Sequence, residues 1–219
     1  MNKKLLTAIA LLGILAVGAV AQADIIWDQS DYDINMQSWY DSVSGCPPFG
    51  FTVHSANDIH VWDTSTITTI TTWYTPFNGG TGAATQAHLY IAPKTGPLPI
   101  DGVDLPQENG TLVTITATPD PNTGFWVITA SGLSVTLTAG DYWVSLTPIL
   151  PGGPWGADTH VRSMTTLGDP AAYYQYCGAG SFVWTVLPEP IDLSILIEGT
   201  VGAVPVESTT WGDTKALFR

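Results

Sequence analysis

The feature that most constrains this fold is an alternation of apolar and hydroxyl side chains with a period of two residues. Between residues 111 and 118, Val113, Ile115 and Ala117 alternate with threonines, and the same pattern recurs at 133–138. Successive side chains of a β-strand point to opposite faces of the sheet, so each run predicts a strand with one face in the core and the other in solvent. This alternation is typical of antiparallel sheets.

Turn signals separate the predicted strands. Asp120 to Gly124 reads Asp-Pro-Asn-Thr-Gly and predicts a hairpin loop between strands at 111–118 and 125–130. Residues 65–75 repeat their apolar positions every third residue, which predicts a long strand that either contains a bulge or is covered on both faces. The strand spacing predicts an all-β fold, an antiparallel jelly-roll-like β-sandwich of about 10–13 strands.

The first 23 residues are typical of a secretory signal peptide. Two lysines precede an uncharged apolar run at 5–20, and small residues mark a cleavage site after Ala23. The run of about 16 residues is short for a membrane span, which favours a cleaved signal over an uncleaved anchor. We expect a signal peptide at 1–23, a β-sandwich domain at 24–199 and a C-terminal tail or terminal strand at 200–219. The protein would then be secreted to the extracellular space or the outer surface of a bacterium, with no membrane span after cleavage.

The charge balance restricts the partners. Without the signal peptide the chain keeps four basic residues against nineteen acidic ones, and only Lys94 and Arg162 lie in its body. Such a chain cannot neutralise phosphates, so we expect no nucleic-acid partner. Calcium, cationic partners or simple solubility are compatible with this charge.

The two cysteines, Cys46 and Cys177, predict one disulfide, because an even number in an exported chain favours pairing. Two separate buried thiols are the alternative. The bridge would close a loop of about 130 residues, which the chain-entropy model values near 5 kcal/mol.

One acidic segment is a candidate metal site. Asp31, Asp33 and Asn35 alternate along the chain as in the first half of a calcium loop, but the glycine and glutamate that complete such a loop are missing. A solvated acidic loop is the alternative interpretation. We expect no other cofactor, since the four histidines have no ligand spacing. Paired carboxylates of a glycoside hydrolase could lie among the nineteen acids, but the sequence does not give their separation.

Nine tryptophans are many for 219 residues, and two are candidate platforms for stacking on sugars. Trp143 alternates with Tyr142 and Val144, which places it on the predicted solvent face of its strand. Trp155 follows a Pro-Gly-Gly-Pro loop. Packing in the core is the alternative role for most of the nine.

Four segments resemble a diffuse group of bacterial secreted β-sandwich proteins of unassigned function. They are Trp27 to Asp33, Ala56 to Asp58 before a Thr/Ile-rich strand, Leu137 to Ser145 and Ile191 to Gly199, and the similarity spans about residues 24–199. The end of the chain, at 208–219, is similar to Thr-Trp-Gly…Lys-x-Leu-x-Arg tails of otherwise unrelated secreted bacterial proteins. The resemblance implies a role of this tail in sorting or surface attachment; a last β-strand is the alternative.

The sequence therefore favours a secreted, non-enzymatic β-sandwich of the bacterial surface or extracellular matrix, with a structural or adhesive role. A carbohydrate-binding module that uses exposed aromatic residues, with or without calcium, is the second hypothesis, and a glycoside hydrolase the third. The expected partners are a matrix or surface component, such as a polysaccharide, or further copies of the chain joined through edge strands.

Overall fold

The computed structural model describes residues 23–40, 42–43, 52–75, 83–99, 110–149, 159–176, 184–186 and 191–202. These residues form β-strands and no α-helix, so none of them belongs to a helix that could cross a membrane. The strands are β1 (Asp24–Gln29), β2 (Tyr32–Tyr40), β3 (Ser42–Val43), β4 (Thr52–Val61), β5 (Ser65–Thr75), β6 (Gln86–Pro93), β7 (Thr111–Pro119), β8 (Trp126–Leu137), β9 (Gly140–Pro148), β10 (Thr159–Ser163), β11 (Ala172–Tyr176), β12 (Thr185–Val186) and β13 (Ile195–Val201).

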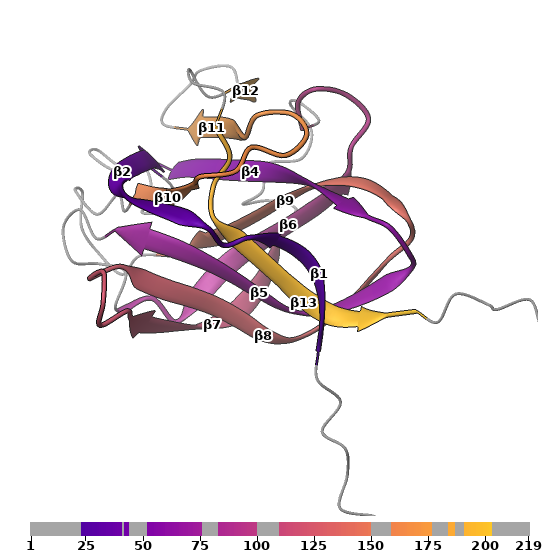
Figure 1. The fold of residues 1–219 in the computed structure, drawn as a ribbon, viewed down its shortest axis with the longest axis horizontal. Coiled ribbons are helices and arrows are strands. Elements are labelled where there is room, and N and C mark those ends of the chain that lie inside the picture. Colours follow the sequence, from indigo (N-terminus) through magenta and orange to yellow (C-terminus); the bar gives the residue numbers. More distant parts are fainter. Residues whose placement is uncertain are drawn as a thin grey trace, which may run out of the picture.

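All strand pairs are antiparallel, which confirms the predicted all-β antiparallel class. Ten of the strands follow the order β1-β13-β5-β8-β7-β6-β9-β4-β11-β12 in one sheet; of the others, β3 pairs with β4, and β10 pairs with both β2 and β5. The sheet curls into a nearly closed barrel, with β5, β8 and β13 in the nearer layer of Figure 1 and β6 and β9 behind them. β7 joins the two layers, because its first half pairs with β6 and its second half with β8.

The core lies between these layers and confirms the alternation read from the sequence. Ile115 of β7 and Leu137 of β8 are buried, and Val113, Ala117, Leu133 and Val135 pack against the same cluster. The threonines between them are exposed. β5 is one long strand, and against β13 it has one extra residue, since Ile67 and Thr69 pair with the neighbouring residues Gly199 and Glu198. This confirms the bulge, one of the two alternatives for residues 65–75.

The loop between β7 and β8 has the predicted hairpin chemistry. The backbone amide of Asp120 donates to the carbonyl of Phe125, and that of Gly124 donates to the carbonyl of Asp120. The Asp120 carboxylate also accepts from the amide of Asn122. Gly124 has a φ of 74°, a conformation that glycine adopts without steric cost.

β9 departs from the alternation, and our placement of Trp143 on a solvent face was wrong. Trp143 and Val144 are both 1 % exposed. Trp143 packs in a second cluster on the outer side of the barrel, together with Ala56, Tyr90 and Trp184. Trp184 directly precedes β12, and Figure 1 shows β11 and β12 beside β4 on this side. Both faces of β9 are therefore covered.

The two ends of the described body lie together. β1 pairs with β13, with Asp24 opposite Gly199, and the amide of Gly202 donates to the carbonyl of Thr64. The chain therefore enters and leaves the barrel at the same end, next to the turn between β4 and β5. β13 runs to Val201, two residues past the predicted end of the domain at 199. The rest of the predicted tail at 200–219, from residue 203 on, and residues 1–22 of the predicted signal peptide at 1–23 lie outside the described residues.

Candidate functional site

Charged and aromatic side chains gather on the outer face of the β4–β9 pair. Ile59 and Val61 point into the core, so Asp58 and His60 point outward. The register sets Asp58 opposite Trp143 and His60 opposite Asp141. Directly paired residues share a face of the sheet, so two strands bring these four side chains together.

The exposed end of this row is a corner formed by His60, Trp62 and Asp141, here called the Trp62 corner. His60 Nδ1 lies 2.6 Å from Asp141 Oδ1, and the two side chains are 36 % and 59 % exposed. The His60 ring meets the Trp62 ring edge to face, with centroids 4.2 Å apart. Trp62 itself is 76 % exposed, so the contact with His60 holds the indole without covering it.

Next to this corner, Lys94 joins two carboxylates. Its Nζ lies 2.5 Å from Asp58 Oδ2, 2.8 Å from Asp169 Oδ2 and 5.2 Å from the centre of the Trp143 ring. Burial alone would lower the pKa of Lys94, but its contacts with Asp169 and Asp58 outweigh burial and raise it. The lysine therefore stays charged and neutralises Asp58, which is 6 % exposed.

The segment that carries Asp169 closes over this cluster because of one glycine. Gly168 has a φ of 79°, and a Cβ at that position would overlap the Asp58 carboxylate. The amide of Asp169 donates to Asp58 Oδ2 over 3.0 Å. Only a residue without a side chain allows this approach.

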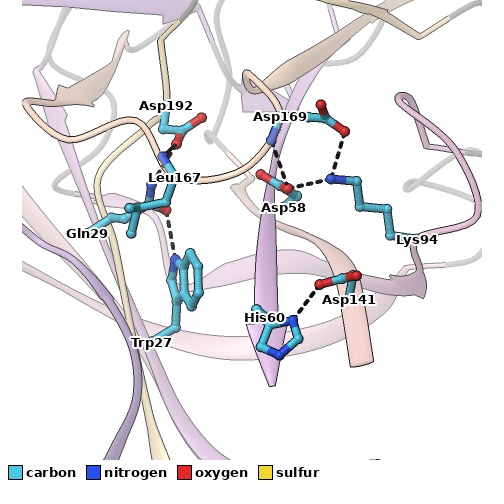
Figure 2. Close-up of polar contacts among 9 residues, drawn as sticks. All are labelled: Trp27, Gln29, Asp58, His60, Lys94, Asp141, Leu167, Asp169 and Asp192. Atoms are coloured by element: carbon cyan, nitrogen blue, oxygen red, sulfur yellow. Dashed lines mark hydrogen bonds and ion pairs between the residues drawn. The ribbon is translucent and has the colours of Figure 1, made fainter. Parts of the chain in front are cut away.

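A second buried carboxylate holds the same segment from its other side. Asp192 Oδ2 accepts from the Gln29 side chain over 2.6 Å and from the amide of Leu167 over 2.7 Å. Asp192 is fully buried, and among the described residues its Oδ1 has no hydrogen-bond partner. Burial raises the pKa of Asp192 to about 6, with a smaller contribution from the charge of Asp58. Figure 2 shows the Leu167–Asp169 stretch between the two aspartates.

Asp31, from the predicted calcium segment, contacts the residues just before the Leu167–Asp169 stretch. Its carboxylate accepts hydrogen bonds from Ser163 Oγ over 2.7 Å and from the hydroxyl of Thr165. Asp33 and Asn35 belong to β2, and their side chains lie outside the described residues. The described side chains include no group of three or more metal-ligand residues, and calcium binding at 31–35 stays a prediction.

The other predicted site residues divide into two groups. Trp143 is buried against Lys94 and the second cluster, so it is not a platform for a ligand. Trp155, Cys46 and Cys177 lie outside the described residues, so the second platform and the disulfide stay predictions.

The sequence analysis missed the Trp62 corner. Its signal was a tryptophan directly after an alternating strand, followed by Asp63 and Thr64 in a turn. An aromatic residue in a polar turn has no core to enter, which distinguishes Trp62 from tryptophans inside strands. His60 and Asp141 are 81 residues apart, and only the pairing of β4 with β9 joins them.

Comparison with models of known protein families and with curated proteins finds no match for this chain.

Proposed function

We propose that this chain is a secreted, non-enzymatic protein of the bacterial surface or extracellular matrix, with a structural or adhesive role. The observation that carries the proposal is the Trp62 corner: an indole that is 76 % exposed yet in contact with the His60 ring on a nearly closed barrel. An exposed aromatic residue on a rigid support is typical of a binding surface, because little conformational freedom is lost on contact. We further propose that the barrel is a jelly-roll-like sandwich.

The position of the corner supports an adhesive role. The backbone carbonyl of Thr64, two residues from Trp62, accepts a hydrogen bond from the amide of Gly202, the last described residue. A tail that anchors the protein would therefore begin beside the corner. Among the described strands, β1 pairs with β13 alone, so its other edge is unpaired there, and its Ile25 side chain is exposed. Self-association of copies through this edge strand is a second way to build a matrix.

Fractionation of the native bacterium tests the proposal. We expect antibodies against the protein to detect it in the outer-surface or matrix fraction, with a mature N-terminus at Asp24 by mass spectrometry. The Trp62→Ala variant should shift towards the culture medium, while the Leu112→Ala variant, which removes another exposed apolar side chain, should not. Retention in the cytoplasm, or an intact signal peptide on the located protein, would contradict the proposal.

A carbohydrate-binding module is the second candidate. It is favoured by the same corner, because an aromatic ring flanked by a carboxylate and an imidazole is suited to stack on a sugar ring and bind its hydroxyl groups.

A further inference from the structure

We infer that the Trp62 corner is a binding site for neutral hexose polysaccharides. The inference rests on the proposed adhesive function and gives it a ligand class. It depends on three properties of the corner: an accessible ring, polar groups at fixed positions, and the sign of the surrounding charge.

The accessible ring is Trp62. Sugar rings carry one face of C–H groups that packs on an aromatic ring, and tryptophan offers the largest such surface. The indole is 76 % exposed, and the buried residues Ile59 and Val61 anchor the strand that leads to it. The platform is therefore available and fixed before a ligand arrives.

The polar groups are His60 and Asp141. Their contact of 2.6 Å sets the orientation of the imidazole, while the side chains stay 36 % and 59 % exposed. The carboxylate can accept from sugar hydroxyls with the oxygen that the imidazole does not occupy. A ring stacked on Trp62 would have these groups at its edge, which is the arrangement that gives a sugar site its specificity.

The charge favours neutral sugars. Asp141 is at the corner and Asp63 follows Trp62, while the nearest described lysine, Lys94, is already paired with Asp58 and Asp169. The whole chain carries a formal charge of −13. Polyuronates and sulfated glycans would be repelled, and neutral hexose chains would not.

Affinity electrophoresis under native conditions tests the inference, since a chain with a pI near 4.2 migrates towards the anode. The mature chain is run through gels that contain dextran, laminarin or hydroxyethyl cellulose, with alginate as an anionic probe and glycol chitosan as a cationic one. We expect retardation by at least one neutral polymer and none by alginate. Retardation by glycol chitosan should persist in Trp62→Ala, because the acidic surface as a whole attracts this polymer.

Variants assign the binding to the corner. Trp62→Ala should weaken binding to the neutral polymer about tenfold or more, which is the loss expected of an aromatic anchor. Trp62→Phe should keep part of the affinity, and Leu112→Ala, at a position 52 % exposed on β7, should keep all of it. Circular dichroism before each run checks that the variants are folded.

Several outcomes would overturn the inference: no retardation by any neutral polymer, equal binding by Trp62→Ala, equal loss in Leu112→Ala, or stronger binding to alginate. A chain that fails these assays but stays at the cell surface would leave the adhesive role intact. A chain that binds through Trp62 but is retained in the cytoplasm would refute the role and keep the site.

Discussion

Gly168 couples the backbone of one segment to the buried carboxylate of another. Its positive φ and the absence of a Cβ let the amide of Asp169 reach Asp58. A side chain here would have to displace Asp58, which Lys94 also holds. The effect of one methyl group therefore extends to the whole cluster.

We expect Gly168→Ala to lower the free energy of unfolding by about 2–4 kcal/mol, from the strain of a positive φ together with the disturbed ion pair. Gly124→Ala is the matched control, because its φ is 74° and no atom lies within 4 Å of its added Cβ. Strain alone should make that change cost about 1 kcal/mol. Urea unfolding of both variants measures the difference, and equal losses would show that the contact with Asp58 contributes nothing.

Asp192 predicts a pH dependence of stability. Its pKa is raised from 3.8 to about 6 in the folded protein, so the folded state holds this proton more tightly than the unfolded chain does. The protonated Asp192 carboxyl therefore stabilises the folded state; this contribution is complete below about pH 4 and is lost as the pH rises to about 6. The difference between the two pKa values corresponds to about 3 kcal/mol.

The Asp192→Asn variant isolates this effect, because asparagine does not ionise but can still accept from Gln29 and Leu167. We expect wild type to lose about 3 kcal/mol relative to the variant between pH 4 and pH 7. Denaturant unfolding across this range measures the difference, in which the other titrating groups cancel. A constant difference would refute the raised pKa.

At the scale of elements, alternation predicted the strands but not which outer faces are covered. In β7 and β8 the threonine side is exposed, as the pattern indicates. In β9 the outer residues Trp143, Ser145 and Thr147 are buried instead. The cover includes Trp184, 41 positions further along the chain, and the pattern of β9 itself carries no trace of it.

The ion-paired residues Asp58, Lys94 and Asp169 connect β4, the end of β6 and the segment before β11. We predict that they stabilise the packing of these three elements. Lys94→Met would leave the Asp58 carboxylate buried without its counter-ion, which costs about 3–5 kcal/mol. Asp169→Asn should cost less than about 1 kcal/mol, because that carboxylate is 46 % exposed. Thermal unfolding compares the two variants, and a Lys94→Met protein as stable as wild type would contradict the prediction.

For the whole molecule, the predicted disulfide would join the chain just beyond the ends of two strands that flank β4. Val43, the last residue of β3, and Tyr176, the last of β11, pair with Thr52 from opposite sides. Two strands that flank a third one lie about 10 Å from each other, whereas the two Cα atoms of a disulfide lie about 5.5–6 Å apart. In the sequence, Cys46 follows Val43 by three positions and Cys177 follows Tyr176 directly; both cysteines lie outside the described residues, and their disulfide stays a prediction.

We expect the intact mass of the mature chain to be lower by two hydrogen atoms than that of the reduced form. Reduction, or Cys46→Ser, should lower the free energy of unfolding by up to about 5 kcal/mol, since the bridge constrains a long loop of the unfolded chain. Free thiols in the native secreted protein, measured by alkylation under denaturing conditions, would refute the bridge.

The sequence thus predicts the class of fold and the hairpin at Asp120–Gly124, and it gives a bulge as one of two alternatives for β5, because neighbouring residues determine these features. It did not predict the pairing of His60 with Asp141 or the contacts of Asp58 and Asp192 with the 167–169 segment, because these join residues more than 20 positions apart. Trp143 failed as a platform for the same reason: its burial depends on distant segments.

The pairing of β1 with β13 has a mechanical consequence. Asp24 lies opposite Gly199, so a pulling force applied to the two chain ends would act at one end of this strand pair. The hydrogen bonds between the strands would then carry the load one after another, as in a zipper, rather than all together. A tether through the C-terminal end alone would put no load on the β1–β13 pair. The barrel would therefore resist tension better when it is held by one end than when it is stretched between both ends.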